Sequence, residues 1–114
     1  MGPEVASLMD RARAAGVSHV VCCGTAPGDW EAVLGLADRY PELIPMVGLH
    51  PWRVAGAPRD WAEGLTQALS RPSVGLGECG LDFGLEGDRG AQEAALRVQL
   101  RLARRLDRPV ALHC

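Results

Sequence analysis

The sequence has no C-x-x-C pair and no long apolar run, and its acidic and basic residues almost balance. Without paired cysteine motifs we expect neither a zinc ribbon nor a disulfide framework, and the four cysteines are read as free thiols. Every apolar run is shorter than the roughly 18 residues that cross a bilayer, which predicts no membrane segment and a cytoplasmic location. The formal net charge of -2 excludes a global attraction to nucleic acid or to an anionic membrane, so any such binding must be local.

What the sequence does have is enough apolar residues for a packed core, 47% of 114 residues. Apolar residues at helical spacing alternate with short, apolar, strand-like runs. Helices are expected from Val5 to Gly16, from Asp29 to Pro41, from Asp60 to Pro72 and from Ala91 to Asp107, with Asp29 and an Asp60/Glu63 capping box as start signals. Strands are expected over 17–23, 43–49, 73–78 and 109–113.

This alternation predicts an α/β fold with a parallel sheet, because right-handed crossovers place helices against the sheet between successive parallel strands. Two architectures satisfy it, a doubly wound sheet and part of a (β/α)8 barrel. A complete barrel needs about 250 residues and eight strands. Residues 1–114 would then form one partial barrel domain. Strand order separates the two, since sequential neighbours indicate a barrel segment and a reversal indicates a doubly wound sheet.

Polar residues follow the predicted strands at the same end. Thr25, His50, Glu78 and His113 each lie at or just after the carboxyl end of a strand. Carboxyl ends of parallel strands share one face, and ligands bind there in barrels and open sheets alike. We therefore expect these four residues to surround a functional site.

Glu78 is the strongest candidate, because a carboxylate beside Gly77 and Gly80 is accessible to a ligand and costly to bury unpaired. It could bind a metal, act as a general acid or base, or pair with a buried cation. His50 and His113 are either ligands or hydrogen-bonded core histidines. Asp82 could hold its loop or orient a ligand.

The three tryptophans and the arginines of the last helix have simpler explanations. Trp30 and Trp61 fit core positions of helices, whereas Trp52 lies beside His50 and is a candidate for substrate contact. The arginines between 97 and 108 lie on the outer face of their helix. We interpret them as a solvated surface and not as a phosphate site.

Three motifs together resemble the TatD-type deoxyribonucleases. They are GLHPW at 48–52, GECGLDF at 77–83, and the segment from Gln99 through PVALH at 109–113, and the AAGV entry into the first strand at 14–17 extends the likeness. The resemblance implies a metal-dependent phosphodiesterase on an amidohydrolase-type (β/α)8 barrel, acting on DNA as an exonuclease.

The same resemblance implies roles for individual residues. It implies that Glu78 is the catalytic, metal-binding carboxylate, that His113 is a second metal ligand and that His50 lies close to the metals. We assign His50 to substrate binding, together with Trp52 and Asp82, which are placed there by their positions in the sequence. Two divalent ions per complete site, Mg, Mn or Zn, would bind the scissile phosphate and activate water.

The chain also departs from the family, which opens with a His-x-His strand and continues to a further histidine and an aspartate. Neither segment is present here. We therefore expect a fragment that is inactive alone and that self-associates through its two open sheet edges. Two alternatives stay open at this point, a complete doubly wound binding module without catalysis and an amide or ester hydrolase on the same barrel.

Overall fold

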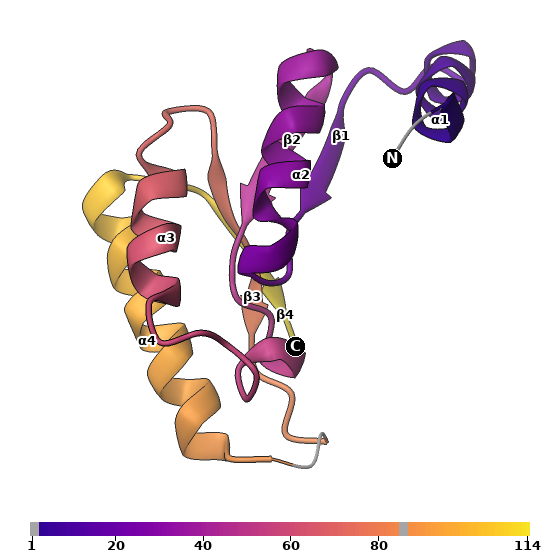
Figure 1. Cartoon of the computed structure of the whole chain (residues 1–114). Coiled ribbons are helices and arrows are strands. Elements are labelled where there is room, and N and C mark those ends of the chain that lie inside the picture. Colours follow the sequence, from indigo (N-terminus) through magenta and orange to yellow (C-terminus); the bar gives the residue numbers. More distant parts are fainter. Residues whose placement is uncertain (1–2, 85–86) are drawn as a thin grey trace.

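The computed structural model describes residues 3–84 and 87–114 and alternates helices with strands as the sequence predicts. Figure 1 shows these elements, which are α1 (Pro3–Ala14), β1 (Val20–Cys23), α2 (Pro27–Arg39), β2 (Leu43–Val47), the 3-10 helix η1 (Pro51–Arg53), α3 (Trp61–Leu69), β3 (Gly75–Gly80), α4 (Arg89–Leu106) and β4 (Val110–His113). Within these described ranges, no helix is both long and apolar enough to cross a bilayer.

The four strands are all parallel and lie in the order β1-β2-β3-β4. Each strand therefore pairs with its neighbour in sequence, as in a barrel wall, and the order never reverses. The doubly wound alternative is wrong for this reason. Register shifts between Leu76 and Cys79, where β3 bends against β4. The sheet is a (β/α) half-barrel.

Helices α2, α3 and α4 pack against one face of the sheet. The main core between them is apolar, with Val47, Leu65, Leu69 and Leu76 fully buried. Trp30 is buried in this core and Trp61 packs against it, which confirms their structural role. A smaller cluster of Met9, Tyr40 and Leu43 attaches α1 to the sheet.

The sheet is less covered elsewhere. Val21 and Ile44, aligned on β1 and β2, remain exposed, and so do Val110 and Leu112 on β4. Within the described residues, β1 and β4 each have one strand partner. Apolar side chains and two strand edges are thus left accessible to another chain.

Both helix caps predicted from the sequence differ from the structure. Asp29 is the third residue of α2 and not its cap, because Pro27 occupies the first position, which suits a residue without an N–H. Its carboxylate instead accepts hydrogen bonds from the Thr25 and Ala26 N–H groups. Asp60 does precede α3, but its side chain makes no capping bond, so the expected capping box is absent.

Candidate active site

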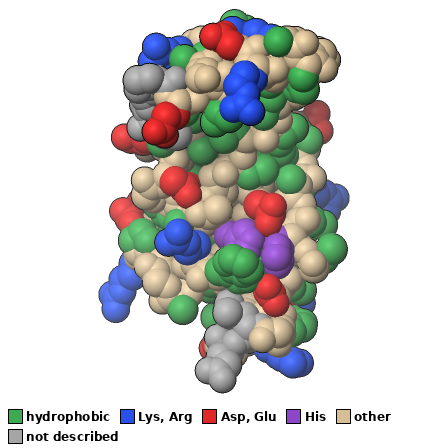
Figure 2. Space-filling model, turned by 90° about the vertical axis from the view of Figure 1, so that its right-hand side faces the viewer, with side chains coloured by type: hydrophobic (Ala, Val, Ile, Leu, Met, Phe, Trp, Pro, Cys, Tyr) green, Lys and Arg blue, Asp and Glu red, His purple; other side chains and the backbone are tan. Residues whose placement is uncertain are grey.

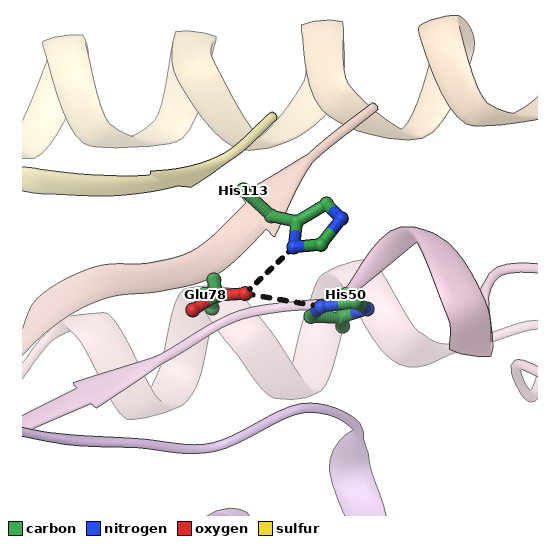
Figure 3. Close-up of side chains that lie close together, drawn as sticks. All are labelled: His50, Glu78 and His113. Atoms are coloured by element: carbon green, nitrogen blue, oxygen red, sulfur yellow. Dashed lines mark hydrogen bonds and ion pairs between the residues drawn. The ribbon is translucent and has the colours of Figure 1, made fainter. Parts of the chain in front are cut away.

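Three of the predicted site residues meet at the carboxyl end of the sheet. His50 follows β2, Glu78 lies in β3 and His113 ends β4. Glu78 Oε1 lies 3.0 Å from His50 Nε2 and 3.2 Å from His113 Nδ1 (Figure 3). Figure 2 shows the histidine side chains together at the surface, beside acidic and hydrophobic side chains. Residues far apart in the sequence thus form one cluster because parallel strands end at the same edge.

The backbone of the loop after β1 forms hydrogen bonds with two residues of this cluster. The carbonyl of Thr25 accepts the His50 N–H at 2.8 Å, and the carbonyl of Gly24 accepts the Glu78 N–H at 3.1 Å. The Thr25 hydroxyl donates a hydrogen bond to the Asp29 carboxylate at 2.6 Å. The structure brings Thr25, and Gly24 before it, next to the predicted site residues, where their carbonyls act as backbone acceptors.

His50 is a hydrogen-bond donor in this arrangement. The residue is 7% exposed, and its Nδ1 accepts the backbone N–H of Trp52 at 3.1 Å. An N–H can only donate, so Nδ1 holds a lone pair and the proton lies on Nε2. That Nε2–H points at Glu78. His50 therefore presents a proton to the site and not a metal-binding lone pair.

Asp82 lies on the other side of His113. Its Oδ2 accepts the indole N–H of Trp52 at 2.8 Å and lies 3.1 Å from His113 Nε2, while Oδ1 accepts the Gly84 N–H at 3.2 Å. These interactions, with the Trp52 hydrogen bond first and the His113 hydrogen bond next, hold the pKa of Asp82 below its ordinary value. The carboxylate is therefore ionised and an acceptor at neutral pH.

Trp52 covers one side of the cluster with its ring. It contacts both histidines edge-on, with ring centroids 5.0 Å from His50 and 5.9 Å from His113, yet it remains 61% exposed. A cleft of about 330 Å³ opens beside it, lined by Thr25, His50, Glu78 and others. An exposed aromatic ring beside a cleft offers a surface on which a ligand can stack.

The sequence analysis gave no role to two residues of the site, although Gln99 opens the third motif. Gln99 and Gln92 lie seven positions apart on the inner face of α4 and are buried. Gln99 bonds both the N–H and the C=O of Leu49, at 2.8 and 3.2 Å, and Gln92 does the same to Asp82, at 2.8 and 3.1 Å. The signal for them was a pair of amides within an otherwise apolar helix face.

The cluster contains the types of ligand atom that bind divalent cations. One ligand atom from each of His50, Glu78 and His113 lies within 4.8 Å of the others. Carboxylate oxygen and imidazole nitrogen bind Mg, Mn and Zn. Since His50 presents Nε2–H, Glu78 and His113 are the two members of this group, within the residues described, that offer lone pairs. Catalytic zinc sites use three protein ligands. Glu78 and His113 are therefore of the right chemical type, but they are one ligand fewer than such a site needs.

Sequential parallel strands with histidine and carboxylate groups at their carboxyl ends are features of metal-dependent barrel hydrolases. The chain belongs to the TatD related DNase family, which it matches over residues 2–114. This confirms the resemblance inferred from the three motifs.

Individual relatives support the assignment. The chain is 37% identical to a 3'-5' ssDNA/RNA exonuclease TatD from Edwardsiella piscicida, over 97% of this chain and 44% of that protein. It is 41% identical to the uncharacterized metal-dependent hydrolase YjjV of Escherichia coli K12, over 98% of this chain and 44% of the relative. The crystal structure of YjjV, a TatD homologue, superposes with a TM-score of 0.87 at 36% identity, covering 99% of this chain and 46% of that one. The chain thus spans less than half the length of these relatives.

Proposed function

We propose that residues 1–114 are part of one barrel domain of a metal-dependent hydrolase that cleaves DNA phosphodiester bonds as an exonuclease. The observation that carries the proposal is the convergence of His50, Glu78 and His113 on one point at the strand ends. Support for a nucleic-acid substrate comes from the TatD relative, which is named a 3'-5' ssDNA/RNA exonuclease.

In this proposal Glu78 and His113 hold divalent cations, two in a complete site. Such ions supply an activated water and neutralise charge on the scissile phosphate. Glu78 provides carboxylate oxygen and His113 provides Nδ1. His50 carries its proton on Nε2 and therefore serves to donate a hydrogen bond to a phosphate oxygen in the same cleft.

Trp52 is the proposed surface for a nucleobase. Base stacking on an aromatic ring tolerates any sequence, as an exonuclease requires, and contributes about 1–3 kcal/mol per base. Asp82 holds the indole of Trp52 through its N–H, and Trp52 remains 61% exposed. This assigns to His50, Trp52 and Asp82 the substrate-binding part of the site.

The metal proposal is tested by calorimetric titration of the purified chain with Zn²⁺ and with Mn²⁺. Glu78→Gln keeps the shape of the side chain and removes its charge, so we expect affinity to fall by more than about 100-fold. Glu63→Gln on the exposed surface of α3 is the matched control and should bind as the unaltered chain does. Equal affinities for the Glu78→Gln and Glu63→Gln variants would contradict the proposal.

The substrate is tested in a complete barrel. Because the chain aligns with 44% of the Edwardsiella piscicida TatD, it can replace the corresponding segment of that protein. We expect the chimera to shorten single-stranded DNA from its 3' end in the presence of metal, and Glu78→Gln to abolish this. Hydrolysis of small amides or esters without DNA cleavage would instead favour the other barrel chemistry.

The isolated chain should have no nuclease activity, because Glu78 and His113 are too few ligands for a catalytic metal pair. DNA cleavage by the purified chain that requires metal and is lost in Glu78→Ala would refute this. We further propose that the isolated chain self-associates through β1, β4 and the exposed apolar residues of the sheet.

A further inference from the structure

His113 lies between two carboxylates. Its Nδ1 is 3.2 Å from Glu78 Oε1 and its Nε2 is 3.1 Å from Asp82 Oδ2. A neutral imidazole has one N–H, so only one carboxylate can receive that proton in a hydrogen bond, and the other nitrogen keeps a lone pair. Which carboxylate receives it decides whether Nδ1 can bind a cation next to Glu78.

The surroundings of Asp82 orient it for this role. Its backbone N–H and C=O are both bonded to the amide of Gln92, which is buried on α4. Its carboxylate is held by the indole N–H of Trp52 at 2.8 Å and by the Gly84 N–H at 3.2 Å. These donors keep Oδ2 directed at His113 Nε2.

Glu78 is directed differently. The Nε2–H of His50 already points at Glu78 Oε1, the same oxygen that faces His113 Nδ1. A second N–H from His113 would bring two donors to this oxygen and leave no nitrogen lone pair facing the cluster. Asp82 Oδ2 also accepts one N–H already, that of the Trp52 indole, so the number of donors does not distinguish the two carboxylates. Only a proton on His113 Nε2, however, leaves a nitrogen lone pair facing the cluster.

We propose that Asp82 is a positioning residue that holds the proton of His113 on Nε2, so that Nδ1 is the atom offered to a cation together with Glu78. This inference rests on the function proposed above, because a cation beside Glu78 requires the lone pair on Nδ1. Asp82 thereby acts through His113, in addition to its place near the substrate.

The test is long-range ¹H–¹⁵N correlation of the histidine rings in the labelled, metal-free chain, at about two pH units above the ordinary imidazole pKa of about 6.5. The His113 signal is assigned by its loss in His113→Gln. The unaltered chain should show the Nε2–H form. In Asp82→Asn, an amide oxygen competes with the stronger carboxylate acceptor of Glu78, and the proton should shift toward Nδ1.

Asp88→Asn is the matched control. Asp88 caps α4 by accepting the Ala91 N–H, and asparagine caps equally well, so this variant removes one carboxylate that does not bond His113. It should leave the His113 spectrum unchanged. Identical His113 nitrogen shifts in Asp82→Asn and in the unaltered chain would overturn the proposal.

Zinc titration separates this inference from the proposed function. Asp82→Asn should weaken Zn²⁺ binding by about 10–100-fold, and Asp88→Asn should not. If the unaltered chain does not bind Zn²⁺ but the proton still shifts in Asp82→Asn, metal binding by this chain fails and the role of Asp82 stands. Weaker Zn²⁺ binding without a proton shift would contradict that role.

Discussion

Gln99 and Leu49 are joined as two strands of a sheet would be, although one is a helix side chain and the other a loop backbone. The Leu49 N–H donates to Gln99 Oε1 at 2.8 Å, and Gln99 Nε2 donates back to the Leu49 C=O at 3.2 Å. Gln99 is 1% exposed and Leu49 is equally buried. Because His50 is the next residue, this amide helps to set where its ring lies.

Gln99→Leu should therefore destabilise the chain. Leucine matches the volume of glutamine but leaves the Leu49 N–H and C=O buried without partners, at about 1–3 kcal/mol each. We expect the free energy of unfolding, measured with urea, to fall by about 2–4 kcal/mol. Gln67→Leu makes the same change on the exposed face of α3 and should alter the free energy of unfolding by less than about 0.5 kcal/mol. Comparable losses in both variants would show that Gln99 does not hold Leu49.

Gly80 is required where β3 meets β4. Its φ is +151°, a region that side chains rarely adopt, and a Cβ there would collide with the backbone of His113. Gly80→Ala should lower the free energy of unfolding by at least about 2 kcal/mol. Gly35→Ala, in the middle of α2 with open space around it, should instead raise it by about 0.5–1 kcal/mol. The midpoint temperature of thermal unfolding should therefore fall in Gly80→Ala and rise in Gly35→Ala.

The four thiols should differ in reactivity. Cys114 is exposed, whereas Cys79 is buried, and burial followed by the charge of Glu78 raises the pKa of the Cys79 thiol to about 11. Because the thiolate is the reactive form, iodoacetamide at about pH 8 should label Cys114 well before Cys79, as read by peptide mass spectrometry. Labelling of both at equal rates is expected only in urea.

The same pKa shift has a consequence for stability. An unfolded Cys79 would lose its proton at lower pH than the folded one, so the folded state binds more protons between the two pKa values. This contribution to the free energy of unfolding should decline as pH rises from about 9 toward 11. Cys79→Ser should flatten that part of the pH profile.

Self-association should depend on β4. Leu112 lies on this edge strand and is 59% exposed, and Leu8 on α1 is 57% exposed away from it. A lysine on an edge strand opposes pairing with another chain. Sedimentation velocity should show less association for Leu112→Lys than for Leu8→Lys. A monomeric unaltered chain would contradict the proposed self-association itself.

Much of the fold and the positions of the cluster residues could be predicted from the sequence. Helices and strands followed from the spacing of apolar residues, since that spacing reflects which side of each element is buried. His50, Glu78 and His113 were placed on one face because parallel strands end together. Asp29 was misread as a cap, since its residue type fits that role, but Pro27 starts the helix two residues earlier.

The partners of the site residues could not be predicted in the same way. Gln92 and Gln99 are amides on an apolar helix face, and their value depends on the Asp82 and Leu49 backbones that come to lie opposite them. The proton position on His50 is likewise decided by the N–H of Trp52, which turns toward Nδ1 only when η1 forms. No local sequence pattern indicates that the groups joined by these hydrogen bonds will meet.

The sequence by itself determined the alternation of helices and parallel strands, and hence a face on which one carboxylate and two histidines gather. Only the tertiary structure decided that the strands lie in sequential order, as in a barrel wall, and that His50 and His113 present different atoms to Glu78. The physical reason is that apolar spacing records burial within each element. Strand order and hydrogen-bond direction depend on which distant groups meet when the elements pack.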